Sequence, residues 1–115
     1  MKPVMKIDEY GTKRWKLDGR YHREDGPAIE WRDGSKVWFI NGERHRYDGP
    51  AVEDSDGGKY WFINGELHRE DGPAIERADG TKYWYVNGEQ ITDEVEKDIE
   101  DGRLKPYDQW TESDL

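Results

Sequence analysis

The sequence predicts an all-β protein: an elongated, twisted antiparallel sheet of 23-residue β-hairpin repeats, closed by a short C-terminal capping helix. The first of three observations is that the 115-residue chain repeats itself every 23 residues through most of its length. Secondly, each repeat contains a short β-branched and aromatic segment ending in Asn-Gly or Asp-Gly, dipeptides typical of two-residue hairpin turns. Thirdly, only five or six residues separate successive turn signals, which leaves no room for a helix within the repeats.

Several types of residue recur at the 23-residue period. Trp15, Trp38, Trp61 and Trp84 lie 23 residues apart, as do the turn pairs Asp18-Gly19, Asn41-Gly42, Asn64-Gly65 and Asn87-Gly88, and the Asp-Gly-Pro segments that begin at Asp25, Asp48 and Asp71. The first unit is incomplete, since Val-Met-Lys-Ile at 4–7 stands where later units have Pro-Ala-(Ile/Val)-Glu. We therefore expect about four units in an array over residues 1–91, followed by an acidic segment at 92–115.

Each of the four recurring tryptophans lies in a predicted strand. The segment 36–40 reads Lys-Val-Trp-Phe-Ile and runs into Asn41-Gly42, so a second strand should return through Glu43–Arg46. Side chains alternate between the two faces of a strand. The face with the tryptophans is the predicted core, because the other face is polar in the first unit. The predicted core residues are Trp15, Trp38, Ile40, Trp61, Ile63, Trp84 and Val86.

The opposite face changes in character along the chain. It carries Arg14 and Lys16 in the first unit and aromatic residues in the later ones. The candidate partner-binding residues on this aromatic face are Phe39, Tyr60, Phe62, Tyr83 and Tyr85. Tyrosine and phenylalanine offer rigid contact area to a protein partner. Alternatively, the C-terminal segment or a second copy of the chain covers the rings.

The C-terminal segment is acidic and contains the one predicted helix, at residues 92–102. Thr92 is suited to the N-cap and Gly102 to the position after the last turn, while Val95 and Ile99 form a short apolar stripe. We expect this segment to cap the last unit, as the end of a repeat array requires. Residues 89–115 hold ten acids and three bases, so −7 of the net charge of −9 lies here. This charge is a solvated helix face or, alternatively, an imitation of nucleic-acid phosphates that occupies a basic pocket on another protein.

Composition sets limits on the core and on the chemistry. Hydrophobic residues make up 32% of the chain and charged residues 39%, but 13% are aromatic, which predicts a thin aromatic core. There is no cysteine and therefore no disulfide or thiolate metal site. With no membrane-length apolar run and no signal peptide, we expect a soluble cytoplasmic protein.

The period, the Trp strand that ends in Asn-Gly, and the Asn-Gly-Glu-Leu-His (64–68) and Asp-Gly-Thr-Lys-Tyr (79–83) segments resemble MORN repeats. The resemblance is closest to divergent MORN-like repeats in uncharacterised proteins of bacteria, tailed phages and large viruses, and it covers residues 4–91. It implies chains of β-hairpins that form an elongated twisted sheet, and contact with protein or lipid without catalysis.

His22, His45 and His68 are each followed by arginine and then, two residues later, by aspartate. They could be metal ligands or general bases, but successive two-stranded units lie about 10 Å apart, too far for the rings to share one metal ion. Ile91 stands at the same position in the fourth unit, so we favour a structural role in which the ring nitrogens bond a turn.

The recurring cations also have two interpretations. The arginines at 23, 46 and 69 and the lysines at 36, 59 and 82 could form a basic stripe for nucleic acid. Glutamates recur at 30, 53 and 76, so ion pairs within the sheet explain both series better. The near balance of charge over residues 1–88 also argues against a nucleic-acid partner.

The sequence therefore favours a non-enzymatic interaction module that binds a protein partner of unknown identity through the aromatic face. No catalytic residue, metal ligand or cofactor is predicted. An alternative is a phage or mobile-element inhibitor that blocks a host factor or sequesters a small signalling ligand. A His/Asp hydrolase is the least favoured hypothesis. An exposed terminal strand could also pair with a second copy to give a homodimer.

Overall fold

The structure is a computed structural model that describes residues 1–92 and residue 102. The described chain is all-β and contains antiparallel strands and no helix. The helix predicted for residues 92–102 lies outside the described residues, apart from its two ends. The strands are β1 (Val4–Ile7), β2 (Lys13–Leu17), β3 (Arg20–Tyr21), β4 (Ile29–Glu30), β5 (Lys36–Val37), β6 (Phe39–Ile40), β7 (Glu43–Arg44), β8 (Val52–Glu53), β9 (Lys59–Tyr60), β10 (Phe62–Ile63), β11 (Glu66–Leu67), β12 (Ile75–Glu76), β13 (Lys82–Val86) and β14 (Glu89–Ile91).

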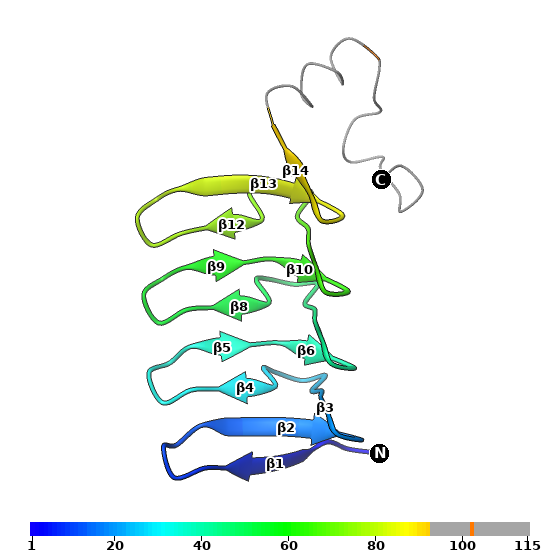
Figure 1. Cartoon of the computed structure of the whole chain (residues 1–115), viewed down its shortest axis with the longest axis vertical. Helices are drawn as coiled ribbons and strands as arrows, with labels where there is room; N and C mark the ends of the chain where they lie inside the picture. Colours follow the sequence, from blue (N-terminus) through cyan, green and yellow to red (C-terminus); the bar gives the residue numbers. More distant parts are fainter. Residues whose placement is uncertain (93–101, 103–115) are drawn as a thin grey trace.

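One open sheet forms the framework. Its ten strands follow the order β1-β2-β4-β5-β8-β9-β12-β13-β14, and β3 pairs with β2 beside this path. The pairs β6–β7 and β10–β11 form two further small ladders. Because sequential strands are neighbours, the chain rises through the sheet one hairpin at a time, with β1 at one end of the stack and β13 and β14 at the other (Figure 1).

The hairpin turns have the predicted geometry. Asn41, Asn64 and Asn87 have φ angles of 50°, 49° and 50°, and the glycines that follow them have φ angles of 82°, 82° and 79°. Positive φ at both central residues is the signature of a type I′ turn, which asparagine and glycine adopt with little strain. The return strands are shorter than predicted: β7 ends at Arg44 rather than at Arg46.

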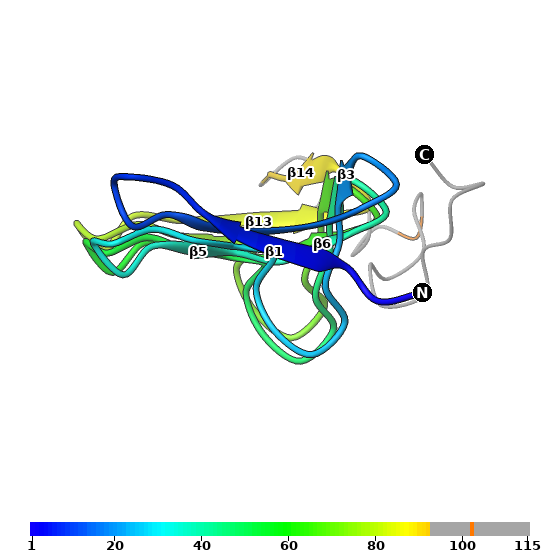
Figure 2. The same ribbon diagram turned by 90° about the horizontal axis from the view of Figure 1, so that it is seen from below.

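The tryptophan strands change partner at the tryptophan. The Trp38 N–H donates to the Ala51 carbonyl at 2.8 Å, while the Trp38 carbonyl accepts from the His45 N–H at 3.1 Å. The strand segment before Trp38 therefore belongs to the wide sheet, and the segment after it belongs to the β6–β7 hairpin. Viewed along the stack, the wide sheet is one layer, and the loops that follow the hairpins bulge from one of its faces (Figure 2).

The core differs from the predicted one. The buried apolar residues are Ala28, Ile29, Val37, Ala51, Ala74, Ile75 and Val86. Val86 is the only predicted core residue among them, and Trp84 is 44% exposed, so its assignment to the core is wrong. The predicted core residues Trp15, Trp38, Trp61, Ile40 and Ile63 are half-buried. No second layer covers the sheet in the described part of the chain, so small residues beneath neighbouring side chains become buried while the large rings stay partly exposed.

Candidate functional site

The loops that leave each hairpin are built on an arginine stacked against a tryptophan. The segment His-Arg-Tyr-Asp-Gly-Pro at 45–50 connects β7 to the next strand. The Arg46 guanidinium carbon lies 3.8 Å from the centre of the Trp38 ring. Arg23 on Trp15 and Arg69 on Trp61 make the same contact, each at 3.9 Å. The loop arginine therefore covers one face of each of these three indole rings, which is a favourable cation–π geometry.

The rest of the segment holds that arginine in place. Arg46 Nε donates to Asp48 Oδ1 at 3.1 Å, and Nη1 donates to the Pro50 carbonyl at 3.0 Å. Nη1 also lies 3.5 Å from a carboxylate oxygen of Glu53. Arg23 and Arg69 have the equivalent partners 23 residues earlier and later. Each arginine side chain is only 22% exposed, so the recurring arginines are part of the framework.

Gly49 is required by space rather than by backbone conformation. A Cβ atom on Gly49 would lie 3.0 Å from Cζ of Arg46, and the equivalent distances at Gly26 and Gly72 are 3.0 and 2.9 Å. Such contacts are tighter than nearly all real Cβ contacts, so a side chain here would require the guanidinium to shift against the indole ring. The recurring Arg-x-Asp-Gly-Pro segment is thus a packing motif: the aspartate and the proline carbonyl bond the arginine, and the glycine makes room for it.

The histidines bond the neighbouring hairpin turn. Nδ1 of His22 accepts from the Asn41 N–H at 3.0 Å. His45 and His68 accept in the same way from the Asn64 and Asn87 N–H groups at 2.9 Å. A nitrogen that accepts carries no proton, so this bond fixes the Nε2–H tautomer. These contacts agree with the predicted structural role. Among the described residues there is no group of three or more His, Cys, Asp or Glu side chains that could hold a metal ion.

The predicted ion pairs form with arginine. The arginine–glutamate distances range from 3.5 Å for Arg46–Glu53 to 3.9 Å for Arg23–Glu30. Lysine stands opposite glutamate in the sheet register, for example Lys36 opposite Glu53. The recurring cations are therefore adjacent to recurring anions, and the arginines of the predicted basic stripe point into the loops.

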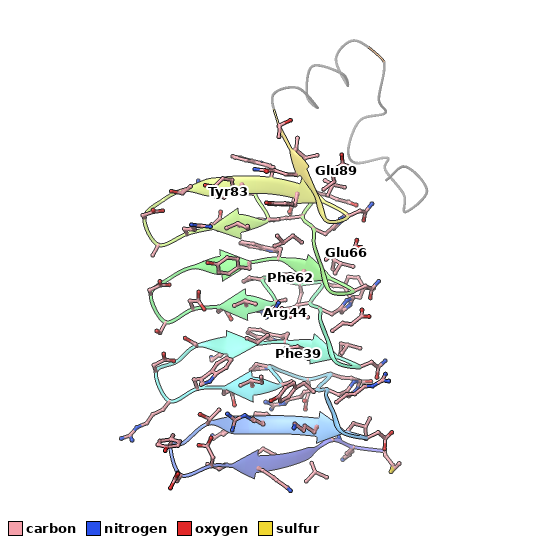
Figure 3. All side chains as sticks on the ribbon, in the orientation of Figure 1. Phe39, Arg44, Phe62, Glu66, Tyr83 and Glu89 are labelled. Carbon is pink, nitrogen blue, oxygen red and sulfur yellow. The ribbon has the colours of Figure 1, made fainter. Side chains whose placement is uncertain are left out.

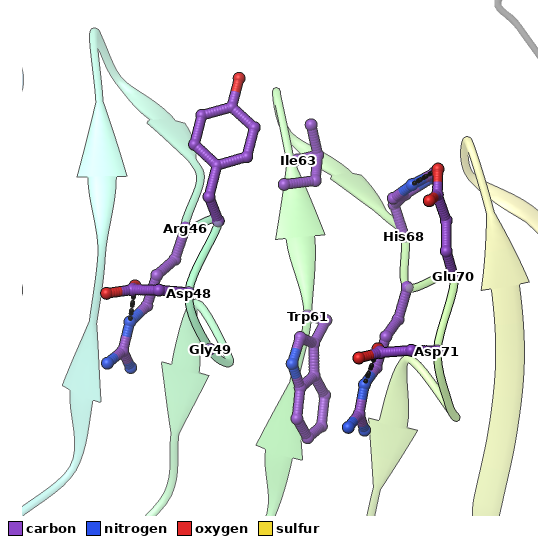
Figure 4. A pocket seen from close by; sticks show the side chains of 10 residues that line it. Arg46, Asp48, Gly49, Trp61, Ile63, His68, Glu70 and Asp71 are labelled. Carbon is purple, nitrogen blue, oxygen red and sulfur yellow. Dashed lines mark hydrogen bonds and ion pairs between the residues drawn. The ribbon is translucent and has the colours of Figure 1, made fainter.

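Two equivalent grooves lie between successive loops. One has a volume of about 690 Å³ and is lined by Arg46, Tyr47, Asp48, Gly49, Trp61, Ile63, His68, Arg69, Glu70 and Asp71. The other, of about 810 Å³, is lined by the ten residues that precede these by 23. Figure 4 shows Trp61 and Ile63 lying between the two loops, whose charged side chains pair with each other within each loop.

The predicted aromatic face lies on the other side of the strands. Trp61 and Ile63 line the loop-side groove, and Phe62 stands between them in the chain and so points to the opposite face. All five predicted residues of the aromatic face, Phe39, Tyr60, Phe62, Tyr83 and Tyr85, are half-buried. Three of them lie on successive levels of the stack in Figure 3, where Phe39, Phe62 and Tyr83 are labelled.

Register aligns these rings with buried aliphatic residues. Tyr60 lies opposite both Val52 and Ile75, and Ile75 in turn lies opposite Tyr83. In a second row, the Phe39 ring contacts the Tyr21 ring, with centroids 5.2 Å apart. Arginine side chains flank the face: Arg44 lies 5.4 Å from the Phe62 ring, and Arg77 lies 5.4 Å from the Tyr83 ring. The structure thus places Tyr60 and Tyr83 in one row with buried aliphatic residues and Phe39 beside Tyr21 in another, with arginine side chains next to the Phe62 and Tyr83 rings.

At the first hairpin the same face is polar and internally paired. Arg14 donates to Asp8 at 2.7 Å. This hydrogen bond, together with one from the Thr12 N–H, lowers the pKa of the Asp8 carboxyl below its usual value. The charge of Arg14 is therefore balanced locally, and in the first unit Tyr21 is the aromatic residue that contacts a later ring, that of Phe39.

Sequence reasoning missed the stacked arginines, although a signal for them is present. Trp and Arg are separated by eight residues in three successive units, at 15 and 23, 38 and 46, and 61 and 69. In the fourth unit the residue eight positions after Trp84 is Thr92. The series thus stops at the one recurring tryptophan that is exposed.

The chain finds no match among protein-family models, curated proteins or solved structures. No helix in the described part of the chain is long and apolar enough to cross a membrane.

Proposed function

We propose that this chain is a non-enzymatic interaction module that binds a protein partner through the aromatic face. The observation that carries the proposal is that half-buried Tyr60 and Tyr83 both lie opposite Ile75 in the open sheet. Strand alternation assigns Phe39, Phe62 and Tyr85 to the same side. Rings flanked by arginines match the composition of the energetically important centre of protein interfaces.

The position of the grooves favours a protein over a small ligand. The two loop-side grooves contain none of the five aromatic residues. Small ligands are usually enclosed in concave sites, whereas the aromatic rings here lie across the surface of a sheet. A broad, shallow partner is the better complement to such a surface.

We further propose that the chain is an array of MORN-like hairpin repeats, with the acidic segment 92–115 as its cap. Support comes from the 23-residue sequence period, from a type I′ turn at each period and from loop contacts that recur at the same step. An interaction module suits such an array, because stacked hairpins present one long surface and no enclosed active site.

The test is affinity capture with matched tyrosine variants. A protein captured from the native cells by the wild-type chain should be lost with the Tyr83→Ser/Tyr85→Ser variant. Tyr47→Ser is the control, because Tyr47 is 81% exposed but lines the loop-side grooves. Retained capture by the double variant, or equal loss with Tyr47→Ser, would rule out the aromatic face as the binding surface.

A further inference from the structure

The sheet contains one type of junction between units, and it occurs three times. Each unit contributes two neighbouring strands to the wide sheet: β1 and β2, β4 and β5, β8 and β9, and β12 and β13. The second strand of one unit pairs antiparallel with the first strand of the next, in β2–β4, β5–β8 and β9–β12. At each junction a lysine stands opposite a glutamate: Lys13 and Glu30, Lys36 and Glu53, Lys59 and Glu76. The chain thus uses the same pairing of a sheet edge with a complementary strand at every junction between units.

At the two ends of the described chain, one strand of each kind has an edge that no strand of the described residues pairs with. At one end, β1 pairs with β2, and no other strand among residues 1–92 pairs with it. At the other end, Lys82 and Tyr83 of β13 pair with β12, and within the same residues no strand lies along their second edge. Open strand edges are templates for pairing with another chain.

These two edges occupy matching positions in the 23-residue period. Lys6 and Ile7 stand where Ile29 and Glu30 stand one unit later, and Lys82 and Tyr83 stand one unit after Lys59 and Tyr60. If β1 of one copy continued the sheet of another at β13, the register of the internal junctions would place Ile7 opposite Lys82. The same register would place Lys6 beside the Tyr83 ring, a favourable cation–aromatic pair.

Each of these two ends carries exposed apolar side chains: three in β1 and Trp84 in β13. Val4, Met5 and Ile7 of β1 are exposed by 63%, 41% and 56%, and Trp84 is exposed at the other end. In the internal junction the Trp61 N–H donates to the Ala74 carbonyl. Met5 stands at the position of this alanine in the first unit, so it would come against Trp84. No arginine among residues 1–92 stacks on that ring as Arg46 does on Trp38. A methionine thioether packs well against an aromatic ring.

Charge selects the orientation of the two copies. Residues 1–23 hold seven bases and three acids, a net charge of +4, while residues 70–92 hold two bases and five acids, a net charge of −3. Pairing β1 with β1 of another copy would bring two cationic ends together. Pairing β1 with β13 brings opposite charges together, which favours association.

We propose that copies of this chain associate head to tail, with β1 of one copy extending the sheet at Lys82–Tyr83 of the next. The contact is heterologous and leaves the same two edges free at the ends of each assembly, so association is open-ended.

The test is sedimentation equilibrium of the full-length chain over a wide concentration range. We expect a weight-average mass that rises with concentration past that of a dimer, and that falls when added salt screens the opposed charges. A chain that stays monomeric at all concentrations, as it would if its own C-terminal residues covered the β13 edge, overturns the proposal. So does a mass that levels off at a dimer.

Substitutions at Ile7 test the register. Ile7→Glu would recreate the lysine–glutamate pair of the internal junctions opposite Lys82, whereas Ile7→Lys would place two lysines together. The association constant of Ile7→Glu should exceed that of Ile7→Lys by about three- to tenfold. Adding Lys82→Glu to Ile7→Lys should restore association. Equal association of the two single variants, or weaker association of Ile7→Glu, would overturn the proposed register. Circular dichroism of each variant checks that the chain remains folded.

Discussion

Trp38 and Trp84 occupy equivalent positions in the sequence period but have different surroundings. Trp38 is half-buried, with the Arg46 guanidinium 3.8 Å from its ring centre. Trp84 is 44% exposed, and the residue eight positions later is Thr92 instead of arginine. Trp38 lies between β5 and β6, and Trp84 lies within β13 at the same position of the period, so the position alone does not decide the burial of the ring. The comparison teaches that burial of an indole ring depends on the arginine in the loop that follows its hairpin, which covers Trp15, Trp38 and Trp61.

The largest expected effect is a difference between the two tryptophans themselves. Trp38→Ala should lower the free energy of unfolding by about 3 kcal/mol, because it removes a ring packed between the sheet and Arg46. Trp84→Ala should lower it by only about 1 kcal/mol, because much of that ring is already in water. Urea denaturation of both variants measures the difference. Equal losses would show that the loop arginine does not determine how much each ring contributes.

Removing the arginine should reproduce most of the Trp38 effect. Arg46→Ala should cost about 2 kcal/mol, since it uncovers the indole ring and leaves the Pro50 carbonyl without its donor. The ion pair with Asp48 contributes little, because the Asp48 side chain is 88% exposed.

Two matched variants separate these contributions. Asp48→Asn should lower the free energy of unfolding by less than about 0.5 kcal/mol. Arg46→Lys should be little more stable than Arg46→Ala, because an ammonium group cannot stack as a planar guanidinium does. A loss for Asp48→Asn as large as that for Arg46→Ala would assign the stability to the ion pair and not to the stacking. Denaturant midpoints of the three variants distinguish the two cases.

Much of the fold follows from the sequence because turn chemistry is local. Asn41-Gly42 and its counterparts require positive φ at two successive residues, and few other dipeptides supply that. Alternation within each strand also placed Tyr60 and Tyr83 on one face, where both lie opposite Ile75, because register in a regular ladder follows the strand period.

The packing of the tryptophans could not be predicted in the same way. Alternation shows which residues share a face, but it does not show what covers that face. The loop that brings Arg46 onto Trp38 bonds through Asp48 and the Pro50 carbonyl, contacts that depend on the path of the loop in three dimensions. The sequence predicted that Glu53 would pair with a recurring lysine or arginine, and the structure pairs it with Arg46. The contact of Arg46 with the indole ring was not predicted at all.

Gly49 allows the stacking to be tested from the other side. Gly49→Ala should cost about 1–2 kcal/mol in the wild-type chain, because its Cβ would lie 3.0 Å from the Arg46 guanidinium carbon. Gly49 has no positive φ angle, so alanine strains no backbone angle there. In an Arg46→Ala background the guanidinium is absent, and the same substitution should be neutral or slightly stabilising. A double-mutant cycle measures this coupling, and an equal penalty in both backgrounds would show that the backbone itself requires glycine.

The smallest expected effect concerns the turns that join β8 to β9 and β12 to β13. Residue 54 is aspartate, while the equivalent residues are Trp31 and Arg77. Burial, together with the nearby charges of Asp56 and Asp33, raises the pKa of the Asp54 carboxyl. The ionised carboxylate is therefore disfavoured in the folded state, and its destabilising effect is present at neutral pH and disappears as the pH falls below the ordinary pKa of aspartate.

Asp54→Asn should then raise the free energy of unfolding at neutral pH by at most about 0.5 kcal/mol, and the gain over the wild-type chain should vanish in acid. Asp79→Asn is the matched control from the next turn, where hydrogen bonds from the Thr81 side chain and N–H lower the pKa of the Asp79 carboxyl. There the sign reverses: the stabilising effect of Asp79 is present at neutral pH and is lost as the pH falls through its folded-state pKa. Thermal unfolding of both variants across this pH range measures the two slopes. A loss of stability for Asp54→Asn at neutral pH would mean that its carboxylate is held by favourable contacts that outweigh burial and repulsion.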